Sequence, residues 1–379
     1  MPLPSTSMPH LRKLMDYAGV LQDEKNSFFP KGMYTAWTVI VFASYWVMIV
    51  SSLVYCWFEA NTREETHKKL NAVTLCLSTA QMMFSHCALL LNREKLRCIL
   101  NEFDSIYDDV KGDSNNYKDL STAEHKSRTF LTNIIIPGCL AVVLPAYFQA
   151  VVRIFVTGEY EKPFKMSYLG MNVFVGEFVH IWSLFSAVVF VVTLYTSVDG
   201  LIAQLTVYTA ILSRMIQSRP AQPDEAYDKK MLELFCKISR LGVSTGQLFG
   251  ETGFLEIVFS TVKSGFPTYH VIMAISTGRF DLLITAASFT IVGISFNFFL
   301  CFAGEKLQSQ MDAVSRATIE SNWADCKPSA RKPISLLLTL SATPLVMHFR
   351  RYAFLNFAAF TSICRGVYSL ISILSNFVR

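Results

Sequence analysis

Long apolar runs alternate with polar stretches rich in lysine and arginine along most of this chain. A helix that crosses a membrane needs roughly 20 mostly apolar residues. Seven segments meet that requirement: residues 34–57, 70–91, 130–156, 171–197, 248–275, 281–304 and 352–377. The pattern therefore predicts an all-α polytopic membrane protein with seven transmembrane helices.

Two of these segments are unusual. The fifth contains Glu251, Glu256, Lys263 and Pro267, and charges are expensive in hydrocarbon, so we expect them to face other protein or water, or to lie beyond the membrane. The fourth lacks proline as far as Gln217, so one helix of roughly 70 Å is expected from residue 171, its amphipathic second half projecting into the cytoplasm. The alternative is a break near Gly200 followed by a helix on the membrane surface.

Residues 305–351 contain helices that are not expected to span. "GEKLQSQMDAVSRATIESNW" predicts an amphipathic helix ending near Trp323, and the prolines of "KPSARKP" predict a loop. "ISLLLTLSA", residues 334–342, is apolar but far too short to cross a bilayer, so other protein must bury it. Together with the long fourth helix, these segments predict a cytoplasmic helical anchor layer.

The distribution of basic residues gives the orientation. The N-terminal segment and the second, fourth and sixth loops hold 24 of the 34 lysines and arginines, whereas the opposite side holds 7. Because cytoplasmic loops carry the excess of basic residues, the N-terminus is expected in the cytoplasm and the C-terminus outside. A G-protein-coupled receptor has the opposite orientation, and a transporter would show paired internal repeats, which this sequence lacks.

The expected organisation has four parts. Residues 1–33 form a cytoplasmic segment, 34–304 hold helices one to six, 305–351 hold the anchor helices, and 352–379 form the last transmembrane helix.

Composition agrees with a membrane protein and gives no sign of catalysis. Hydrophobic residues make up 52% of the chain and charged residues 17%, below the roughly 25% charged residues of soluble proteins. The nine cysteines include no CxxC pair, and the chain shows no nucleophile–base set, phosphate-binding loop or metal-ligand spacing. We therefore expect no enzyme activity, no cofactor, no metal and no nucleic-acid partner.

The last apolar segment carries a polar stripe. Ser362, Arg365, Ser369, Ser372 and Asn376 follow one another at steps of three and four residues, which places them on one side of a helix. Such a stripe is expected to face water or a neighbouring subunit.

The C-terminal third resembles that of insect odorant receptors. The resemblance rests on "GEKLQSQMDAVSRATIESNW", a basic loop, the apolar helix, an S-x-x-P-L pattern, "FAAFTSI" and "VYSLISIL", in that order over residues 300–379. Ala342 and Thr343 stand where the family often has glutamine and a basic residue. The length and the shorter second cytoplasmic loop resemble those of an odour-tuning subunit. A gustatory-type receptor channel of the same architecture is the alternative, although Val367 replaces the threonine of its usual last-helix pattern.

The resemblance implies a subunit of an odour-gated, non-selective cation channel. In that family a heterotetramer with a co-receptor subunit surrounds a central pore lined by the last helix, in the plasma membrane of olfactory sensory neuron dendrites. The partners implied are the co-receptor, a small hydrophobic volatile, the lipid bilayer and the permeating cations.

The resemblance also implies particular sites. The ligand would lie in the outer half of the bundle, among Thr74, Leu77, Ser78, Gln81, Leu144, Tyr147, Phe148, Val151, Phe174, Phe178, Ile181, Phe185, Leu282, Thr285, Ser288 and Phe289. Ile371 would form the hydrophobic constriction of the pore, with Leu370 and Leu374 beside it and Ser372 and Arg365 also in the pore wall.

Overall fold

The structure is a computed structural model of the whole chain. It describes residues 8–17, 20–21, 31–59, 66–111, 120–122, 125–126, 129, 133, 155, 181–182, 199–219, 225–276, 278, 280–321, 323, 328–342, 348–349 and 353–378.

The described part of the chain is helical apart from one very short ladder. The helices are α1 (Pro9–Tyr17), α2 (Lys31–Val54) with the π-helical turn η1 (Tyr55–Glu59), α3 (Thr66–Leu91), α4 (Arg93–Lys111), a helix over 199–217, α8 (Glu225–Ser276), α9 (Phe280–Glu320), α10 (Pro328–Ser341) and α11 (Phe357–Val378). Strands β1 (His348–Phe349) and β2 (Ala353–Phe354) pair antiparallel. The predicted all-helical class is confirmed.

Four described helices are long and apolar enough to cross a membrane. They cover Met33–Phe58, Ala72–Leu91, part of Ala286–Glu320, and Phe357–Asn376. These positions match the predicted first, second, sixth and seventh spans. The third and fourth predicted spans, 130–156 and 171–197, lie almost entirely outside the described residues. The fifth, 248–275, lies within α8, which is not among these four helices. The count of seven and the orientation therefore stay predictions.

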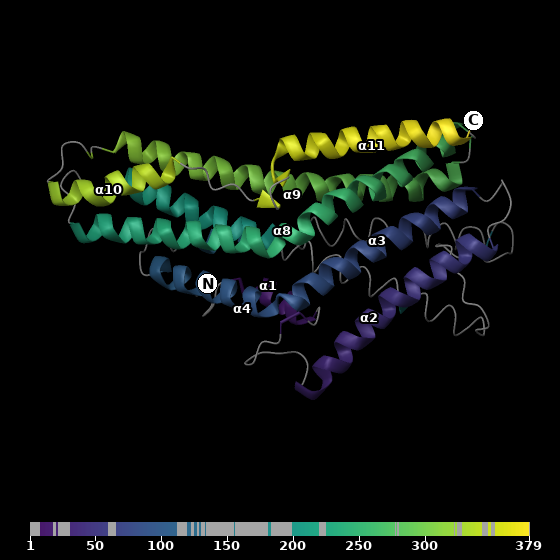
Figure 1. Cartoon of the computed structure of the whole chain (residues 1–379), viewed down its shortest axis with the longest axis horizontal. Helices are drawn as coiled ribbons and strands as arrows, with labels where there is room; N and C mark the ends of the chain where they lie inside the picture. The colour runs from purple at the N-terminus through teal and green to yellow at the C-terminus, as the bar shows by residue number, and fades with distance from the viewer. Residues whose placement is uncertain are drawn as a thin grey trace.

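Helices α8 and α9 form the long axis of the molecule (Figure 1). α8 has 52 residues and α9 has 41, lengths of roughly 78 and 62 Å, each about twice or more the hydrocarbon thickness. The predicted sixth span and the anchor helix after residue 304 therefore belong to one continuous helix, α9. α10 packs on α8 and α9 at one end of the pair, and α11 packs on them at the other.

The predicted loop "KPSARKP" is wrong, because α10 begins at Pro328 and includes Pro333. Proline at the first helical position loses no hydrogen bond, since the first backbone N–H groups of a helix have no partner within it. Pro333 lies in the second turn and deprives the helix of a single backbone donor there. The prediction that other protein buries this segment holds for one side of it: Ile334 and Leu337 are buried, whereas Leu336 and Leu340 are exposed.

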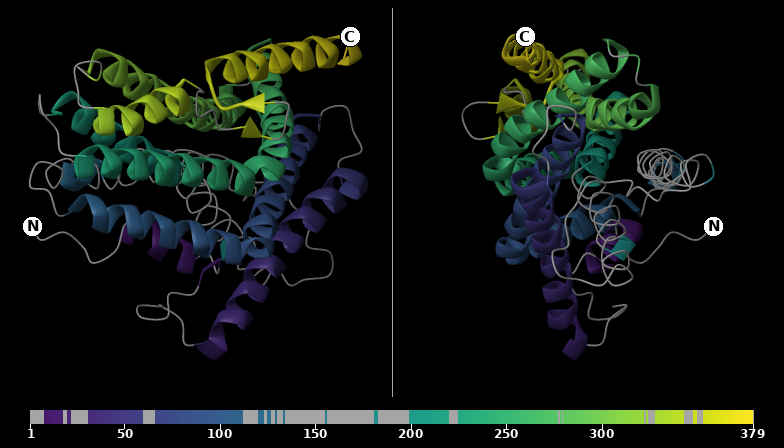
Figure 2. Two further views of the ribbon diagram at one scale, coloured as in Figure 1. Left: turned by 60° about the vertical axis from the view of Figure 1, so that its left-hand side comes forward. Right: turned by 90° about the vertical axis from the view of Figure 1, so that its right-hand side faces the viewer.

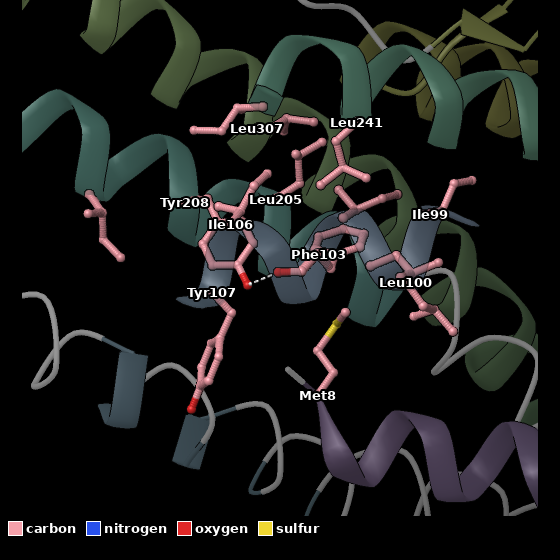
Figure 3. Close-up of a cluster of buried hydrophobic side chains, with 14 of the residues drawn as sticks. Met8, Ile99, Leu100, Phe103, Ile106, Tyr107, Leu205, Tyr208, Leu241 and Leu307 are labelled. Carbon is pink, nitrogen blue, oxygen red and sulfur yellow. Dashed lines mark hydrogen bonds between the residues drawn. The ribbon is translucent and has the colours of Figure 1, made fainter. Parts of the chain in front are cut away.

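A tightly packed core lies at the α10 end of the long helix pair. α4 supplies a buried face at helical spacing: Leu96, Ile99, Leu100, Phe103, Ile106, Tyr107 and Val110. It meets Leu205 and Tyr208 of the 199–217 helix, Leu241 of α8 and Leu307 of α9 (Figure 3). The Tyr208 hydroxyl donates a 3.1 Å hydrogen bond to the Phe103 carbonyl, so the polar end of this buried ring is satisfied. The amphipathic second half of the predicted fourth helix thus packs against protein.

The N-terminal helix joins this core through buried Leu11 and Met15 and through one polar side chain. Arg12 of α1 donates to the carbonyl of Leu100 at 3.0 Å and to the Asp104 carboxylate at 2.8 Å, both in α4. Helices α2 and α3 lie on the side of α8 opposite α11 (Figure 2).

A buried ion pair joins the end of the 199–217 helix region to α8. Nε and Nη2 of Arg219 donate to the two carboxylate oxygens of Asp228 at 2.8 and 2.6 Å, and the side chains are 4% and 0% exposed. Such a two-point pair fixes both distance and orientation. It therefore fixes the position of Arg219, at the end of one helix, relative to the start of α8.

Removing one member of this pair should destabilise the protein strongly. We expect Arg219→Ala or Asp228→Ala to lower the free energy of unfolding by about 3–5 kcal/mol, because the remaining charge stays buried without its partner. The matched control is Glu94→Ala, which breaks the exposed Arg97–Glu94 pair and should cost less than about 1 kcal/mol. Chemical denaturation of the purified variants measures the two losses of unfolding free energy. Equal losses would contradict the assignment of Arg219–Asp228 as a buried, stabilising ion pair.

Candidate functional site

The last helix, α11, has one buried face and one exposed polar face. Ile363 and Val367 are buried against the rest of the protein. Ser362, Arg365, Ser369 and Asn376 are exposed, and Ser372 is half-buried. The predicted stripe therefore points away from the protein's own helices.

The serine hydroxyls of this helix all bond back to its own backbone. Ser362, Ser369 and Ser372 each donate to the carbonyl four residues earlier at 3.0 Å, and Ser375 does so at 2.8 Å. A hydroxyl bonded in this way is satisfied without an external acceptor, so serine is compatible with a helix inside a membrane.

Two side chains fix the start of α11. Asn356 is the N-cap, and its Oδ1 accepts a 3.0 Å hydrogen bond from the backbone N–H of Ala359. Glu305 of α9 accepts a bond from the N–H of Phe357 at 3.3 Å. Two of the N–H groups that have no partner within the helix are thereby satisfied, one of them by the neighbouring helix.

An aromatic cluster packs α9 against the first turn of α11. The ring of Phe298 stacks on Phe302 and Phe357 with centroid distances of 6.1 and 6.0 Å, and meets Phe360 edge-on at 5.5 Å. Phe302 lies 6.3 Å from Phe357. Aromatic pairs at these distances add to the stabilisation from buried area alone.

Three glycines allow close contact between these helices. A Cβ on Gly304 of α9 would overlap the backbone of Leu355, just before α11. A Cβ on Gly265 of α8 would lie 2.5 Å from Cδ2 of Leu370, and one on Gly366 of α11 would lie 2.7 Å from Cγ2 of Thr261 in α8. Small residues let helix backbones approach closely within a membrane.

The sequence over residues 65–368 matches the family described as 7tm Odorant receptor. The chain belongs to this family. Membership places this odorant receptor among multi-pass membrane receptors rather than enzymes.

Solved odorant receptors share its fold. The insect olfactory receptor OR5 from Machilis hrabei in complex with eugenol is similar with a TM-score of 0.78 and 13% sequence identity, over 97% of this chain and 96% of that one. A second structure of OR5 from the same organism gives a TM-score of 0.71 at 12% identity, over 96% and 95% of the two chains. Among curated proteins, no sequence matches significantly.

The described structure contains part of the predicted odorant-binding set. In α3, Thr74, Ser78 and Gln81 are buried and Leu77 is half-buried; the Thr74 and Ser78 hydroxyls donate to the carbonyls four residues earlier at 2.7 and 2.8 Å. α9 contains Leu282, Thr285, Ser288 and Phe289, of which the last two are half-buried, and Ile181 is exposed. Leu144, Tyr147, Phe148, Val151, Phe174, Phe178 and Phe185 lie outside the described residues.

The predicted pore residues all lie on α11 but on different sides of it. Leu370 packs toward Gly265 of α8. Ile371, Ser372 and Leu374 are half-buried, and Arg365 is exposed. Ile371 follows one turn after exposed Tyr368, so it borders the exposed face of the helix.

The supporting residues of α11 were missed by sequence reasoning. The Asn356 cap had a readable signal, since asparagine directly precedes an apolar helix. Glu305 and Gly304 had none, because each acts on a backbone about 50 residues away in the chain.

Adding a methyl group at Gly304 should displace the start of α11. We expect Gly304→Ala to lower the free energy of unfolding by about 1–3 kcal/mol, because the new Cβ meets rigid backbone of Leu355. Gly293→Ala on the same helix is the control, since its nearest neighbour is the Ser264 hydroxyl at 3.3 Å, which can rotate. Thermal unfolding of the two purified variants measures the difference, and no difference would contradict the close contact.

Proposed function

We propose that this odorant receptor is the odour-binding subunit of a ligand-gated, non-selective cation channel. The observation that carries the proposal is the exposed polar face of α11, with Arg365 near its middle. A charged and hydroxyl-rich face is costly against lipid tails, so it is expected to face water or another subunit. An oligomer with α11 around its axis satisfies that requirement.

The proposed topology has seven spans, a cytoplasmic N-terminus and an external C-terminus. The distribution of lysine and arginine supports this orientation. The parts of α8 and α9 beyond the bilayer, with α10, would then form the cytoplasmic anchor layer. Exposed Leu336 and Leu340 of α10 give that layer an apolar surface for a neighbouring subunit.

We further propose a heterotetramer with a co-receptor in the plasma membrane of olfactory neurons. The ligand would be a small hydrophobic volatile, bound in the outer half of the bundle by the aromatic and hydroxyl residues predicted above. Support comes from family membership and from the similar OR5 receptor, whose structure was solved in complex with eugenol.

Within this proposal Ile371 and Leu374 form the gate. Both are half-buried, but Ile371 borders the exposed face, whereas Leu374 follows buried Val367 by two turns. A rotation of α11 would bring both toward the pore axis. Leu370, packed toward Gly265, would support them from behind. A ring of such apolar side chains closes a narrow pore by excluding water.

A thiol-accessibility experiment tests the channel and its pore helix together. In a Cys364→Ser background, which removes an exposed native thiol, Ser369→Cys should let a charged thiol reagent suppress the agonist current in excised patches. Val367→Cys is the control and should be unaffected, because that position is buried. Receptors are expressed with a co-receptor and screened against volatiles. Responses that need G-protein signalling and give no current in excised patches would refute the channel.

A polar side chain at the gate should make the channel leak. We expect Ile371→Ser to raise the basal current several-fold, since a hydroxyl lets water persist in a closed apolar constriction. Ile272→Ser is the matched control: the same substitution at an exposed position of α8, a helix outside the proposed pore wall. Equal basal currents at equal surface expression would contradict the assignment of Ile371.

A further inference from the structure

A groove of about 470 Å³ runs along the 199–217 helix, outside the predicted odorant site and pore. Its second wall is α9, through Phe299, Phe302, Ala303 and Lys306. α1 closes one side, where Leu11 packs 3.1 Å from the position of a Cβ on Gly200. The volume is that of a ligand-binding pocket.

The polar groups of the groove are unevenly distributed. Asp199 and Arg214 stand 15 residues apart on one helix, a separation of roughly 22 Å along its axis. Between them the wall is mostly apolar, with Ala203, Val207 and Ile211. Apart from Asp199, the charged side chains of the described lining are the cations Lys126, Arg214 and Lys306, so the groove as a whole attracts anions.

Asp199 is a buried carboxyl group whose hydrogen-bonding capacity is not satisfied by the described protein. It is 8% exposed, and neither carboxylate oxygen has a hydrogen-bond partner within the described structure. Burial raises the pKa of its carboxyl to about 7. Its neutral form is therefore substantially populated at neutral pH, and a neutral acid tolerates contact with an aliphatic chain, whereas an anion does not.

We propose that this groove binds an anionic phospholipid from the cytoplasmic leaflet. The phosphate lies among Lys126, Arg214 and Lys306, and one acyl chain lies over Val207 and Phe302 toward Asp199. The inference rests on the proposed topology, in which the helix projects from the membrane at the Asp199 end into the cytoplasm at the Arg214 end. A lipid head at the cytoplasmic end and a chain at the membrane end match that direction.

The occupant would contact the support of the last helix. Phe302 lines the groove and also stacks on Phe298 and faces Phe357 of α11. Filling the groove therefore restrains the aromatic cluster that fixes the start of α11.

Lipid retention by the purified full chain tests the proposal without any current. The protein is reconstituted in nanodiscs of phosphatidylcholine that contain phosphatidylglycerol. It is then released from the nanodiscs, and the lipid molecules that stay bound are counted by native mass spectrometry. We expect the double variant Lys126→Gln/Lys306→Gln to retain phosphatidylglycerol about tenfold more weakly, because each basic residue near a lipid surface contributes to binding anionic lipid. Lys332→Gln, an exposed cation of α10 outside the groove, should bind like the wild type.

Filling the groove should abolish retention. Ala203 is exposed and lines the groove, so Ala203→Trp blocks it without disturbing the core, which unchanged thermal unfolding verifies. Retention that survives both this variant and the double variant, equal retention of phosphatidylcholine, or displacement of the lipid by inorganic phosphate would each overturn the proposal. A chain that binds the lipid but passes no current would overturn the channel alone.

The role of Asp199 has its own readout. Because burial raises the pKa of the Asp199 carboxyl to about 7, the wild-type group is mostly charged at pH 8. Asp199→Asn should therefore bind phosphatidylglycerol severalfold more tightly than wild type at pH 8, and about equally at pH 6. Other titratable or charged groups that line the groove or interact with Asp199 are His10 of α1, Cys301 and Lys306 of α9, Lys126, and Arg214 of its own helix. If a His10→Gln variant keeps the pH dependence of lipid binding, that dependence belongs to Asp199. Loss of the pH dependence in His10→Gln, or equal affinities of Asp199→Asn and wild type at pH 8, would overturn the assignment.

Discussion

The pairing of α8 with α9 is the contact on which the other described elements depend. α3, α4 and α10 pack on α8, and α10 and α11 also pack on α9. Both helices are continuous from the core of Phe103 and Tyr208 to the buried face of α11. A rotation of either helix therefore moves the short α10 and the last helix together, and no flexible linker lies between the two ends.

Much of this arrangement was predictable because apolar length is a local property. The first, second, sixth and last spans follow directly from runs of about 20 apolar residues. The stripe on α11 follows from steps of three and four residues, and the structure leaves its face exposed. Even α4, for which no helix was predicted, shows the spacing of a buried face at Leu96, Phe103 and Val110.

The remainder depends on contacts between distant parts of the chain. The prolines of α10 suggested a loop, but Pro328 stands at the first helical position, where proline is tolerated. Packing on α8 and α9 outweighs the donor lost at Pro333. Gly304 looks ordinary in the sequence and matters only because Leu355 passes beside it. Likewise the mixed side chains of the groove, from Leu11 to Lys306, are brought together only by the fold. The predicted odorant set is divided between described helices and segments that the structure does not describe.

The hydrogen-bond direction of the α11 serines has a consequence for what meets that face. Each hydroxyl proton of Ser362, Ser369 and Ser372 points into the helix, toward a carbonyl. What remains on the outside is the lone pairs of the oxygens, which accept but do not donate. These oxygens give the face a weakly negative potential, whereas the guanidinium of Arg365 and the side-chain N–H groups of Asn376 are donors on the same face. In the proposed pore, the balance between these acceptor oxygens and the positive charge of Arg365 would decide which ions this face favours.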